Sequence, residues 1–458
     1  MAVYNRRKSI SVRVGNTAIG GDNPIRLQSM TTTATMDTEG CIEQAIRIIQ
    51  AGGELVRMTT QGTREAENMR LIRDGLTARG FDTPLVADVH FNPAVADVAA
   101  RYVEKVRINP GNYVDPARTF KQLEYTVQEY AQEIQRIRDR FIPFLNICRE
   151  HGTAIRIGVN HGSLSDRIMS RYGNTPAGMV ESCMEFLRIC VEQNFMNVVI
   201  SIKASNTVVM IETVRLLVKE MDRENMAFPI HLGVTEAGEG EDGRIKSAIG
   251  IGALLAEGIG DTIRVSLSEA PEREIPVARK LVDYAAVSAQ VRASAEIENG
   301  ILKLKYTDSS LEDFQLHAAM DAGAMLIDGK AKDLKLSDPN ISAEQIKSTE
   351  EAILQGARIR FSKPEYISCP GCGRTLYNLE ETIARIKAAT SHLKGVKIAI
   401  MGCIVNGPGE MADADFGYVG AGRGKISLYR GKECIEKNIP EENAVERLLR
   451  LIEETTTK

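Results

Sequence analysis

Short apolar runs alternate with longer helical stretches as far as residue 268. The eight runs are residues 25–30, 55–60, 84–90, 105–110, 154–160, 198–205, 229–236 and 261–268. Between them lie helix-like segments such as CIEQAIRIIQAGG and GRIKSAIGIGALLAEG. Strands that alternate with helices predict βα units and a parallel sheet. Eight such units predict an α/β fold of the TIM (β/α)8 type. A doubly wound open sheet is the competing interpretation, but it rarely needs eight strands.

Each run turns polar toward its carboxyl end, although buried parallel strands are normally apolar throughout. The polar residues are Arg57, Asp88, His90, Arg107, Asn109, Arg156, Asn160, Lys203, His231, Glu236, Arg264 and Ser266. Pairs two residues apart, such as Asp88 and His90, point to the same face of a strand. In a barrel these side chains would surround the mouth, which is where active sites of this fold lie.

Five of these polar residues are cations, and each belongs to a different predicted strand. They are Arg57, Arg107, Arg156, Lys203 and Arg264. One such residue is readily explained as a solvated loop start, but five are not, because polar groups on apolar strands carry a burial cost. Guanidinium groups bind oxyanions in bidentate fashion, so this basic ring predicts a phosphate or diphosphate ligand. The glycine-rich loop GEGEDGR after the seventh run either covers this ligand or is only a turn.

The pattern changes twice beyond the predicted barrel. Residues 277–360 are less regular and are interpreted as a linker or a reduced insert domain. Residues 361–458 begin with CPGCGRT and continue with a predicted helix, the strands KIAIMGC and KISLYR, and a final helix. This order predicts a small α/β domain. We therefore expect three parts, which are residues 1–276, 277–360 and 361–458.

Three cysteines in the last part form a candidate metal site. Cys369 and Cys372 make a C-x2-C knuckle, and Cys403 ends a predicted strand within GCIVNGPGE. A knuckle alone fits half a zinc site, a thiol redox pair or an iron–sulfur site. Structural zinc needs four ligands, usually from two knuckles, and Cys434 lies in what looks like an ordinary strand. Three cysteines with an unusual fourth ligand favour a [4Fe–4S] cluster, with Glu410 of the same glycine-rich loop as the best candidate.

Composition narrows the setting in which these sites would work. The chain has 458 residues and a formal net charge of −4, which does not favour nucleic acid as a partner. The sequence contains no apolar run long enough to span a membrane and does not begin with a secretory signal. We therefore expect a cytoplasmic protein without disulfides, in which a cluster among the eight cysteines serves metal or redox chemistry and the four in helical segments are buried small hydrophobes.

Several motifs together resemble one enzyme family. ADVHF, VRINPGN, IRIGVN, HLGVTEAG, EGIGDTIRVSL, CPGCGRT and GCIVNGPGE occur in an order and spacing similar to those of the 4-hydroxy-3-methylbut-2-enyl diphosphate synthase family. The resemblance covers residues 6–275 and 361–430. It implies a TIM barrel followed by a small ferredoxin-like domain that carries a [4Fe–4S] cluster. The implied reaction is the reductive ring opening and dehydroxylation of 2-C-methyl-D-erythritol 2,4-cyclodiphosphate in isoprenoid biosynthesis. Reduced ferredoxin or flavodoxin is the implied electron donor.

The resemblance also implies roles for particular residues. The cluster ligands would be Cys369, Cys372, Cys403 and Glu410. The residues around the substrate would be Arg57, Asp88, Arg107, Asn109, Arg156, Asn160, Lys203, Arg264, Ser266 and Asn406. Glu236 would act as the acid near the reacting carbons, helped by His231 or His90.

The resemblance further implies a homodimer in which the small domain of one subunit caps the barrel of the other. Residues 277–360 depart from the family pattern. Short members join the two domains by a few residues, whereas longer members insert a whole barrel-like domain, and the later part of this segment resembles the end of that insert.

Two other functions remain as alternatives. One is a zinc-stabilised barrel that binds a phosphorylated ligand without redox chemistry. The other is a cluster enzyme of different chemistry, such as a dehydratase. Metal analysis and a visible spectrum would separate the first from a cluster enzyme, and turnover of the cyclic diphosphate would separate the second.

Overall fold

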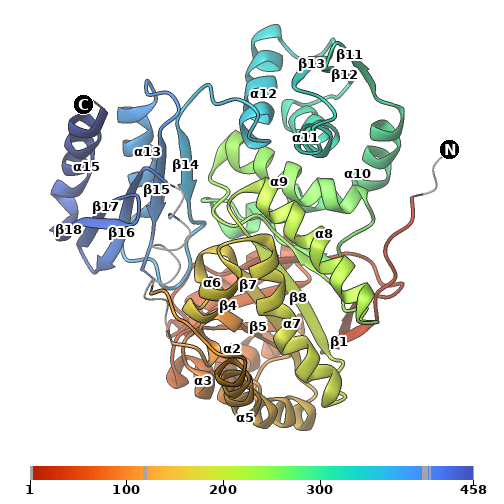
Figure 1. The fold of residues 1–458 in the computed structure, drawn as a ribbon, viewed down its shortest axis with the longest axis vertical. Coiled ribbons are helices and arrows are strands. Elements are labelled where there is room, and N and C mark those ends of the chain that lie inside the picture. The colour runs from red at the N-terminus through yellow and green to blue at the C-terminus, as the bar shows by residue number, and fades with distance from the viewer. Residues whose placement is uncertain (1–3, 117–120, 405–410, 412–413, 457–458) are drawn as a thin grey trace.

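The computed structural model describes residues 4–116, 121–404, 411 and 414–456, and its largest part is a barrel of eight parallel strands (Figure 1). The strands are β3 (Arg26–Met30), β4 (Leu55–Thr60), β5 (Leu85–Val89), β6 (Lys105–Ile108), β7 (Ala154–Asn160), β8 (Val198–Lys203), β9 (His231–Leu232) and β10 (Thr262–Ile263). Neighbours follow chain order from β3 to β8, and β10 pairs with both β3 and β9. A bridge between Ile200 and Ile230 closes the ring. The predicted TIM barrel is confirmed.

Helices cover the outside of this barrel. They are α1 (Thr38–Gln50), α2 (Thr63–Ala78), α3 (Pro93–Ala99), α4 (Pro110–Tyr113), α5 (Val127–His151), α6 (Asp166–Tyr172), α7 (Pro176–Glu192), α8 (Thr207–Arg223), α9 (Gly240–Ala256) and α10 (Glu274–Ser294). Short 3-10 turns lie at His161–Ser163 and Pro271–Arg273. A capping box of Thr126 and Glu129 starts α5, and Gly152 ends it in the left-handed conformation. The domain boundary expected after residue 276 falls inside α10.

A β-hairpin plugs the amino end of the barrel. It consists of β1 (Val12–Val14) and β2 (Thr17–Ile19), which pair in antiparallel fashion. Val12, Val14 and Ile19 pack against residues at the starts of the barrel strands, including Leu55 and Val86. With this end closed by apolar side chains, the opposite end, where the strands finish, is left for a ligand.

Residues 296–356 form a separate layer that we call the middle unit. It contains β11 (Glu296–Glu298), β12 (Ile301–Lys305), α11 (Leu311–Ile327), β13 (Asp333–Ser337) and α12 (Ala343–Gly356), with the strands in the order β11-β12-β13. Helix α11 packs closely on α9 because Gly252 and Gly323 have no side chains at the contact. A Cβ atom on Gly323 would lie 2.9 Å from Ile249, and one on Gly252 would collide with Met320. The middle unit is therefore folded and packs on α9.

The remaining residues form the predicted small α/β domain. It contains β14 (Glu365–Ser368), α13 (Leu379–Thr390), β15 (Lys397–Met401), β16 (Phe416–Gly422), β17 (Lys425–Arg430), β18 (Glu433–Pro440) and α15 (Glu441–Thr456). The sheet follows chain order, parallel from β14 to β16 and antiparallel from β16 to β18. No helix among the described residues is long and apolar enough to cross a membrane.

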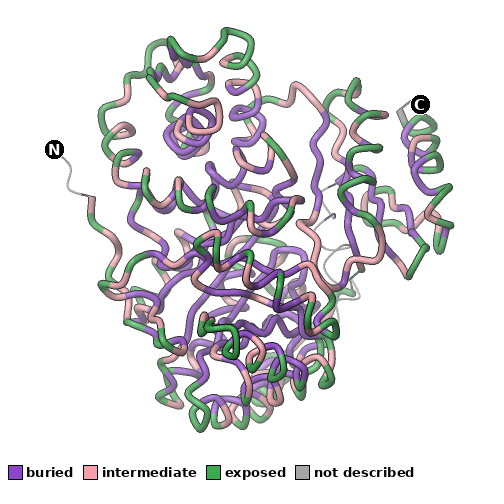
Figure 2. Tube along the Cα trace, turned by 180° about the vertical axis from the view of Figure 1, so that it is seen from behind, coloured by how far each residue is buried: buried purple, intermediate pink, exposed green. Residues whose placement is uncertain are grey.

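The small domain lies on the barrel of its own chain. The Oγ atom of Ser268 donates a hydrogen bond to the carbonyl of Cys369 at 2.9 Å, and Ala237 forms a parallel bridge with Ser368. Helix α12 ends against α9 at Gly356, and the chain passes from there directly to β14 at the barrel mouth. The small domain thus caps the barrel of its own chain here, and the arrangement between subunits implied by the resemblance stays a prediction. Figure 2 shows buried residues in the barrel interior and in the strands of the small domain.

Candidate active site

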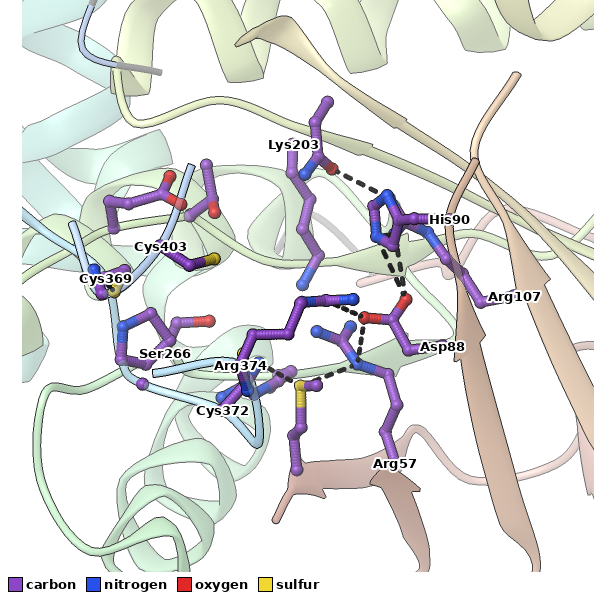
Figure 3. A pocket seen from close by; sticks show the side chains of 18 of the residues that line it. Arg57, Asp88, His90, Arg107, Lys203, Ser266, Cys369, Cys372, Arg374 and Cys403 are labelled. Atoms are coloured by element: carbon purple, nitrogen blue, oxygen red, sulfur yellow. Dashed lines mark hydrogen bonds and ion pairs between the residues drawn. The ribbon is translucent and has the colours of Figure 1, made fainter. Parts of the chain in front are cut away.

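One cavity lies between the barrel mouth and the small domain (Figure 3). Its lining residues from the barrel are Met30, Arg57, Asp88, His90, Arg107, Arg156, Asn160, Ser201, Lys203, Thr235, Glu236, Arg264 and Ser266. Its lining residues from the small domain are Cys369, Pro370, Gly371, Cys372, Arg374, Thr375, Met401, Gly402 and Cys403. The basic ring and the three cysteines predicted from separate parts of the sequence thus face a common space.

Asp88 on β5 is the carboxylate around which the guanidinium groups gather. Its Oδ1 accepts a hydrogen bond from Arg107 at 2.9 Å, and its Oδ2 lies 3.2 Å from Arg374 and 3.8 Å from Arg57. Burial alone would raise the pKa of Asp88, but Arg57 and Arg107 hold it well below its ordinary value. His90 contacts Arg107, and its pKa is lowered to about 3 by burial and by that cation. Asp88 is therefore ionised and His90 neutral near pH 7.

The positive charge of the cavity exceeds what Asp88 can balance. Lys203 and Arg156 are buried, and Nε and Nη1 of Arg156 have no hydrogen-bond partner among the described residues. Burial lowers the pKa of Lys203 well below its ordinary value, and the charges of Arg57 and Arg156 add to this effect. Buried polar groups are normally paired, so unpaired cations around a cavity indicate an anionic ligand.

Two glycines on barrel segments make room for these cations. A Cβ atom on Gly158 would collide with Nε of Arg107, and one on Gly233 would lie 2.7 Å from Nζ of Lys203. Because neither position can carry a side chain without displacing a cation, the barrel interior is shaped around the charged groups. This arrangement supports a binding role for Arg107 and Lys203.

Arg264 has a carboxylate partner other than Asp88, namely Glu274. Its Nε and Nη2 each donate to Glu274 at 3.0 Å, and Ser29 donates to the same carboxylate at 2.7 Å. This bidentate pair fixes the direction of the guanidinium group. Arg264 and Ser266, two residues further along, both line the cavity as their spacing predicted.

Glu236 is held in an unusual backbone conformation at the cavity wall. Its φ is 48°, a value that residues other than glycine rarely adopt. Such strain persists where the surrounding structure enforces it, and it is frequent at functional sites. Glu236 is buried, lines the cavity and follows β9, so a proton donor at this position would face the ligand.

The cysteines occupy the side of the cavity that the small domain supplies. The backbone N–H of Gly402 donates to Sγ of Cys369 at 3.2 Å, and the N–H of Arg374 donates to Sγ of Cys372 at 3.4 Å. Gly371 has a φ of 78°, which lets the chain turn between the two cysteines. No group of three or more His, Cys, Asp and Glu side chains in the described ranges is arranged to hold a single metal ion. The three cysteines line the cavity together.

Most of the residues predicted for the site line the cavity, but some do not. Asn109 uses its Oδ1 to cap α4 through the N–H of Gly111, and His231 is fully buried and hydrogen-bonds Thr262 instead of reaching the cavity. Asn406 and Glu410 lie outside the described residues.

Sequence reasoning missed nine of these lining residues, which are Met30, Ser201, Thr235, Pro370, Gly371, Arg374, Thr375, Met401 and Gly402. Ser201 is two residues before Lys203, so the spacing rule that paired Asp88 with His90 would have found it. Arg374 stands two residues after Cys372, where no periodic pattern marks it.

Comparison with known proteins places both domains in one family. The GcpE TIM-barrel domain matches residues 9–279, and the GcpE protein C-terminal domain matches residues 365–454. Together the two matches span well over half of the chain and leave out most of α10 and all of the middle unit.

Three curated relatives carry the same name, "4-hydroxy-3-methylbut-2-en-1-yl diphosphate synthase (flavodoxin)". The protein of Phocaeicola vulgatus is 53% identical over 600 aligned positions, and that of Bacteroides thetaiotaomicron is 52% identical over 599. In both cases the match covers 98% of this chain and 98% of the relative. The protein of Porphyromonas gingivalis is 44% identical over 572 positions, again with 98% of each chain covered. These alignments are longer than this chain of 458 residues, so more than a hundred of their positions face a gap here.

Proposed function

This chain belongs to the GcpE family, and we propose that it catalyses the reductive ring opening and dehydroxylation of 2-C-methyl-D-erythritol 2,4-cyclodiphosphate to 4-hydroxy-3-methylbut-2-en-1-yl diphosphate. One observation carries the proposal. The cations of the barrel mouth and the three cysteines of the small domain line the same cavity. A diphosphate held by the cations would present its carbon skeleton to whatever the cysteines bind.

We propose that Cys369, Cys372 and Cys403 hold a [4Fe–4S] cluster, and that Glu410 is its fourth ligand. Three features of the described residues fit this group, namely the shared cavity, the N–H groups directed at two of the sulfurs, and the glycine turn between Cys369 and Cys372. Hydrogen bonds to cluster sulfurs are one of the means by which proteins tune the reduction potential. When bound, the cluster would supply electrons one at a time. The flavodoxin in the names of the relatives makes a flavodoxin the expected donor.

The residues of the barrel bind and orient the substrate. Arg57, Arg107, Arg156, Lys203 and Arg264 hold the diphosphate, and Asn160 and Ser266 add neutral hydrogen bonds. Asp88 keeps two of the guanidinium groups directed into the cavity. Fixing the anion in this way removes translational and rotational freedom from the reacting carbons, which is a large share of many rate enhancements.

Proton delivery falls to the carboxyl group of Glu236. The net reaction takes up two electrons and two protons, breaks a carbon–oxygen bond of the ring and releases one oxygen as water. Glu236 and His90 line the cavity, whereas His231 is fully buried in the barrel and does not line it. We therefore retain Glu236 as the proton donor, with His90 rather than His231 as the nearer assistant.

The direct test is turnover by anaerobically purified protein. With reduced flavodoxin and the cyclic diphosphate, we expect the linear diphosphate as product, together with iron and sulfide contents of roughly four per chain. Cys403→Ser should abolish both the visible absorbance and turnover. The matched control is Cys434→Ser on β18, which should keep both. Zinc in place of iron, or a cluster without turnover of this substrate, would overturn the proposal.

The implied homodimer stays a prediction, and a mixing experiment tests which barrel each small domain serves. Lys203→Gln damages only the barrel, and Cys403→Ser damages only the small domain. If each chain completes its own site, mixtures of the two inactive variants stay inactive. Recovered activity in refolded mixtures would show that the domains work across subunits.

A further inference from the structure

Arg374 is a cation that the small domain places inside the cavity of the barrel. It is 8% exposed, lines the cavity beside Cys372, and points toward the barrel residues (Figure 3). Its Nη2 lies 3.2 Å from Oδ2 of Asp88 on β5. A guanidinium group thus crosses the boundary between two domains to reach the carboxylate that also anchors the basic ring.

Asp88, the partner of Arg374, also interacts with two arginines of the barrel. Asp88 also accepts from Arg107 at 2.9 Å and lies 3.8 Å from Arg57, so three guanidinium groups surround one carboxylate. Their combined positive charge exceeds the single negative charge of Asp88. A diphosphate offers several charged oxygens, and guanidinium groups bind such oxygens in bidentate fashion. Arg374 is therefore placed to contact a diphosphate that enters the cavity.

The small domain also contacts the barrel at sites other than Arg374. Outside the cavity, Lys387 pairs with Glu239 at 3.1 Å, Lys246 pairs with Glu365 at 3.4 Å, and the Ala237–Ser368 bridge joins the two backbones. These contacts lie at the rim, where none of their side chains lines the cavity. Arg374 differs from all of them because it joins the domains within the binding space.

We propose that Arg374 is a substrate-binding residue that completes the basic ring from the small domain, and that Asp88 positions it before the anion arrives. Binding of the diphosphate and closure of the small domain are then coupled, since the anion contacts both domains at once. By reciprocity, whatever tightens the closed arrangement also tightens anion binding. The identity of the natural ligand in this inference rests on the proposed function.

The test measures binding of inorganic pyrophosphate to the cluster-loaded protein by calorimetry. Arg374→Gln should weaken pyrophosphate binding by about tenfold or more, because a charge-assisted hydrogen bond is lost. Arg374→Lys keeps the charge but not the bidentate geometry, so its loss should be smaller. Lys387→Gln is the matched control, because it removes an interdomain ion pair outside the cavity and no contact to the anion, so it should weaken pyrophosphate binding far less than Arg374→Gln does.

A second readout follows closure itself. Pyrophosphate should slow hydrogen exchange in the connection at residues 357–364 of the unmodified protein and of Lys387→Gln. The same protection should be lost in Arg374→Gln, whereas a residue with a merely structural role would leave it in place.

Each outcome decides the matter. Unchanged pyrophosphate affinity in Arg374→Gln with an intact cluster spectrum would overturn the inference. If that variant loses its cluster, Arg374→Lys decides instead, and loss of the cluster in both would assign Arg374 to the cluster surroundings and overturn the inference. Failure to turn over the cyclic diphosphate, with pyrophosphate binding still dependent on Arg374, would remove the proposed function and leave the anion site standing. Turnover without any pyrophosphate binding would overturn this inference alone.

Discussion

Lysine side chains occur on parallel strands of both the barrel and the middle unit, but in different surroundings. Lys203 ends β8, whose six residues are all buried. Lys303 and Lys305 on β12 and Lys335 on β13 are exposed and alternate with buried leucines. The barrel strands are covered on both faces, whereas β12 and β13 have one face toward α11 and one toward water.

The meaning of a strand lysine therefore depends on what covers the sheet. On a barrel strand, a cation is buried, and it stays buried at a cost unless a ligand or another residue pairs with it. On the middle unit, the same residue type keeps one face of a small sheet in water. The relatives carry more than a hundred positions that this chain lacks, and neither family domain covers the middle unit.

The free edge of β13 supports the interpretation of the middle unit as complete in itself. The N–H groups of Leu334 and Leu336 donate to Asp333 at 3.0 Å and to Glu350 at 2.7 Å. These side chains occupy backbone donors that another strand would otherwise use. Charged side chains at a sheet edge discourage pairing with a further strand, in agreement with β13 as the last strand of this sheet.

The largest effect is expected from Lys203→Gln in the barrel. Removal of this buried cation should lower kcat/KM by about 10²–10³-fold, because a charge directed at the diphosphate is lost. Burial lowers the pKa of Lys203, so the neutral replacement should not lower the melting temperature. Kinetics with the cyclic diphosphate and a thermal melt check both parts. Normal kcat/KM would mean that barrel lysines, like those of the middle unit, do not serve a ligand.

The next effect is expected from Leu336→Ala in the middle unit. Leu336 is 2% exposed, so the substitution should cost about 2–3 kcal/mol of unfolding free energy through lost burial and a cavity. The kcat of the folded enzyme should change little, since the residue lies outside the cavity. Denaturant unfolding and kinetics below the melting temperature provide the measurement. A stability equal to that of the unmodified protein would show that the leucine face is not a core.

A smaller effect is expected in the pH dependence of stability, which should differ between a histidine buried in the barrel and an exposed one. Burial, with the charges of Arg156 and Lys203, lowers the pKa of His231 well below its ordinary value. Below about pH 6.5 the imidazole of His231 is protonated in the unfolded chain but stays neutral in the folded barrel. The free energy of unfolding therefore falls as the pH drops, by up to about 1.4 kcal/mol per pH unit. His231→Gln should flatten this dependence in thermal melts between pH 7 and 5. Exposed His392 is the matched control, and an equal flattening in His392→Gln would contradict the assignment.

The strand ends were predictable from the sequence because two simple rules act there. The runs at residues 55–60 and 154–160 coincide with β4 and β7, and residues two apart share a face, which brought Asp88 and His90 together. Asn109 fits the same pattern but caps α4, because its Oδ1 accepts a hydrogen bond from the backbone N–H of Gly111. Arg374 has no such signal, because its position depends on how one domain docks on another. The arrangement across subunits implied by the resemblance depends on domain docking in the same way, and it stays a prediction.

The smallest effect is expected from Lys335→Gln, and it completes the comparison with Lys203→Gln. Lys335 is exposed and lies 3.7 Å from Glu350, an ion pair of the kind that contributes little in water. The substitution should change the unfolding free energy by no more than about 0.5 kcal/mol and leave kcat/KM unchanged. The same lysine-to-glutamine substitution at position 203 is expected to abolish most activity. The two variants therefore show whether the effect comes from the residue type or from its surroundings. A large loss of activity in Lys335→Gln would contradict this comparison. It would indicate that the exposed face of the middle unit binds a ligand, because the weak pair with Glu350 does not account for such a loss.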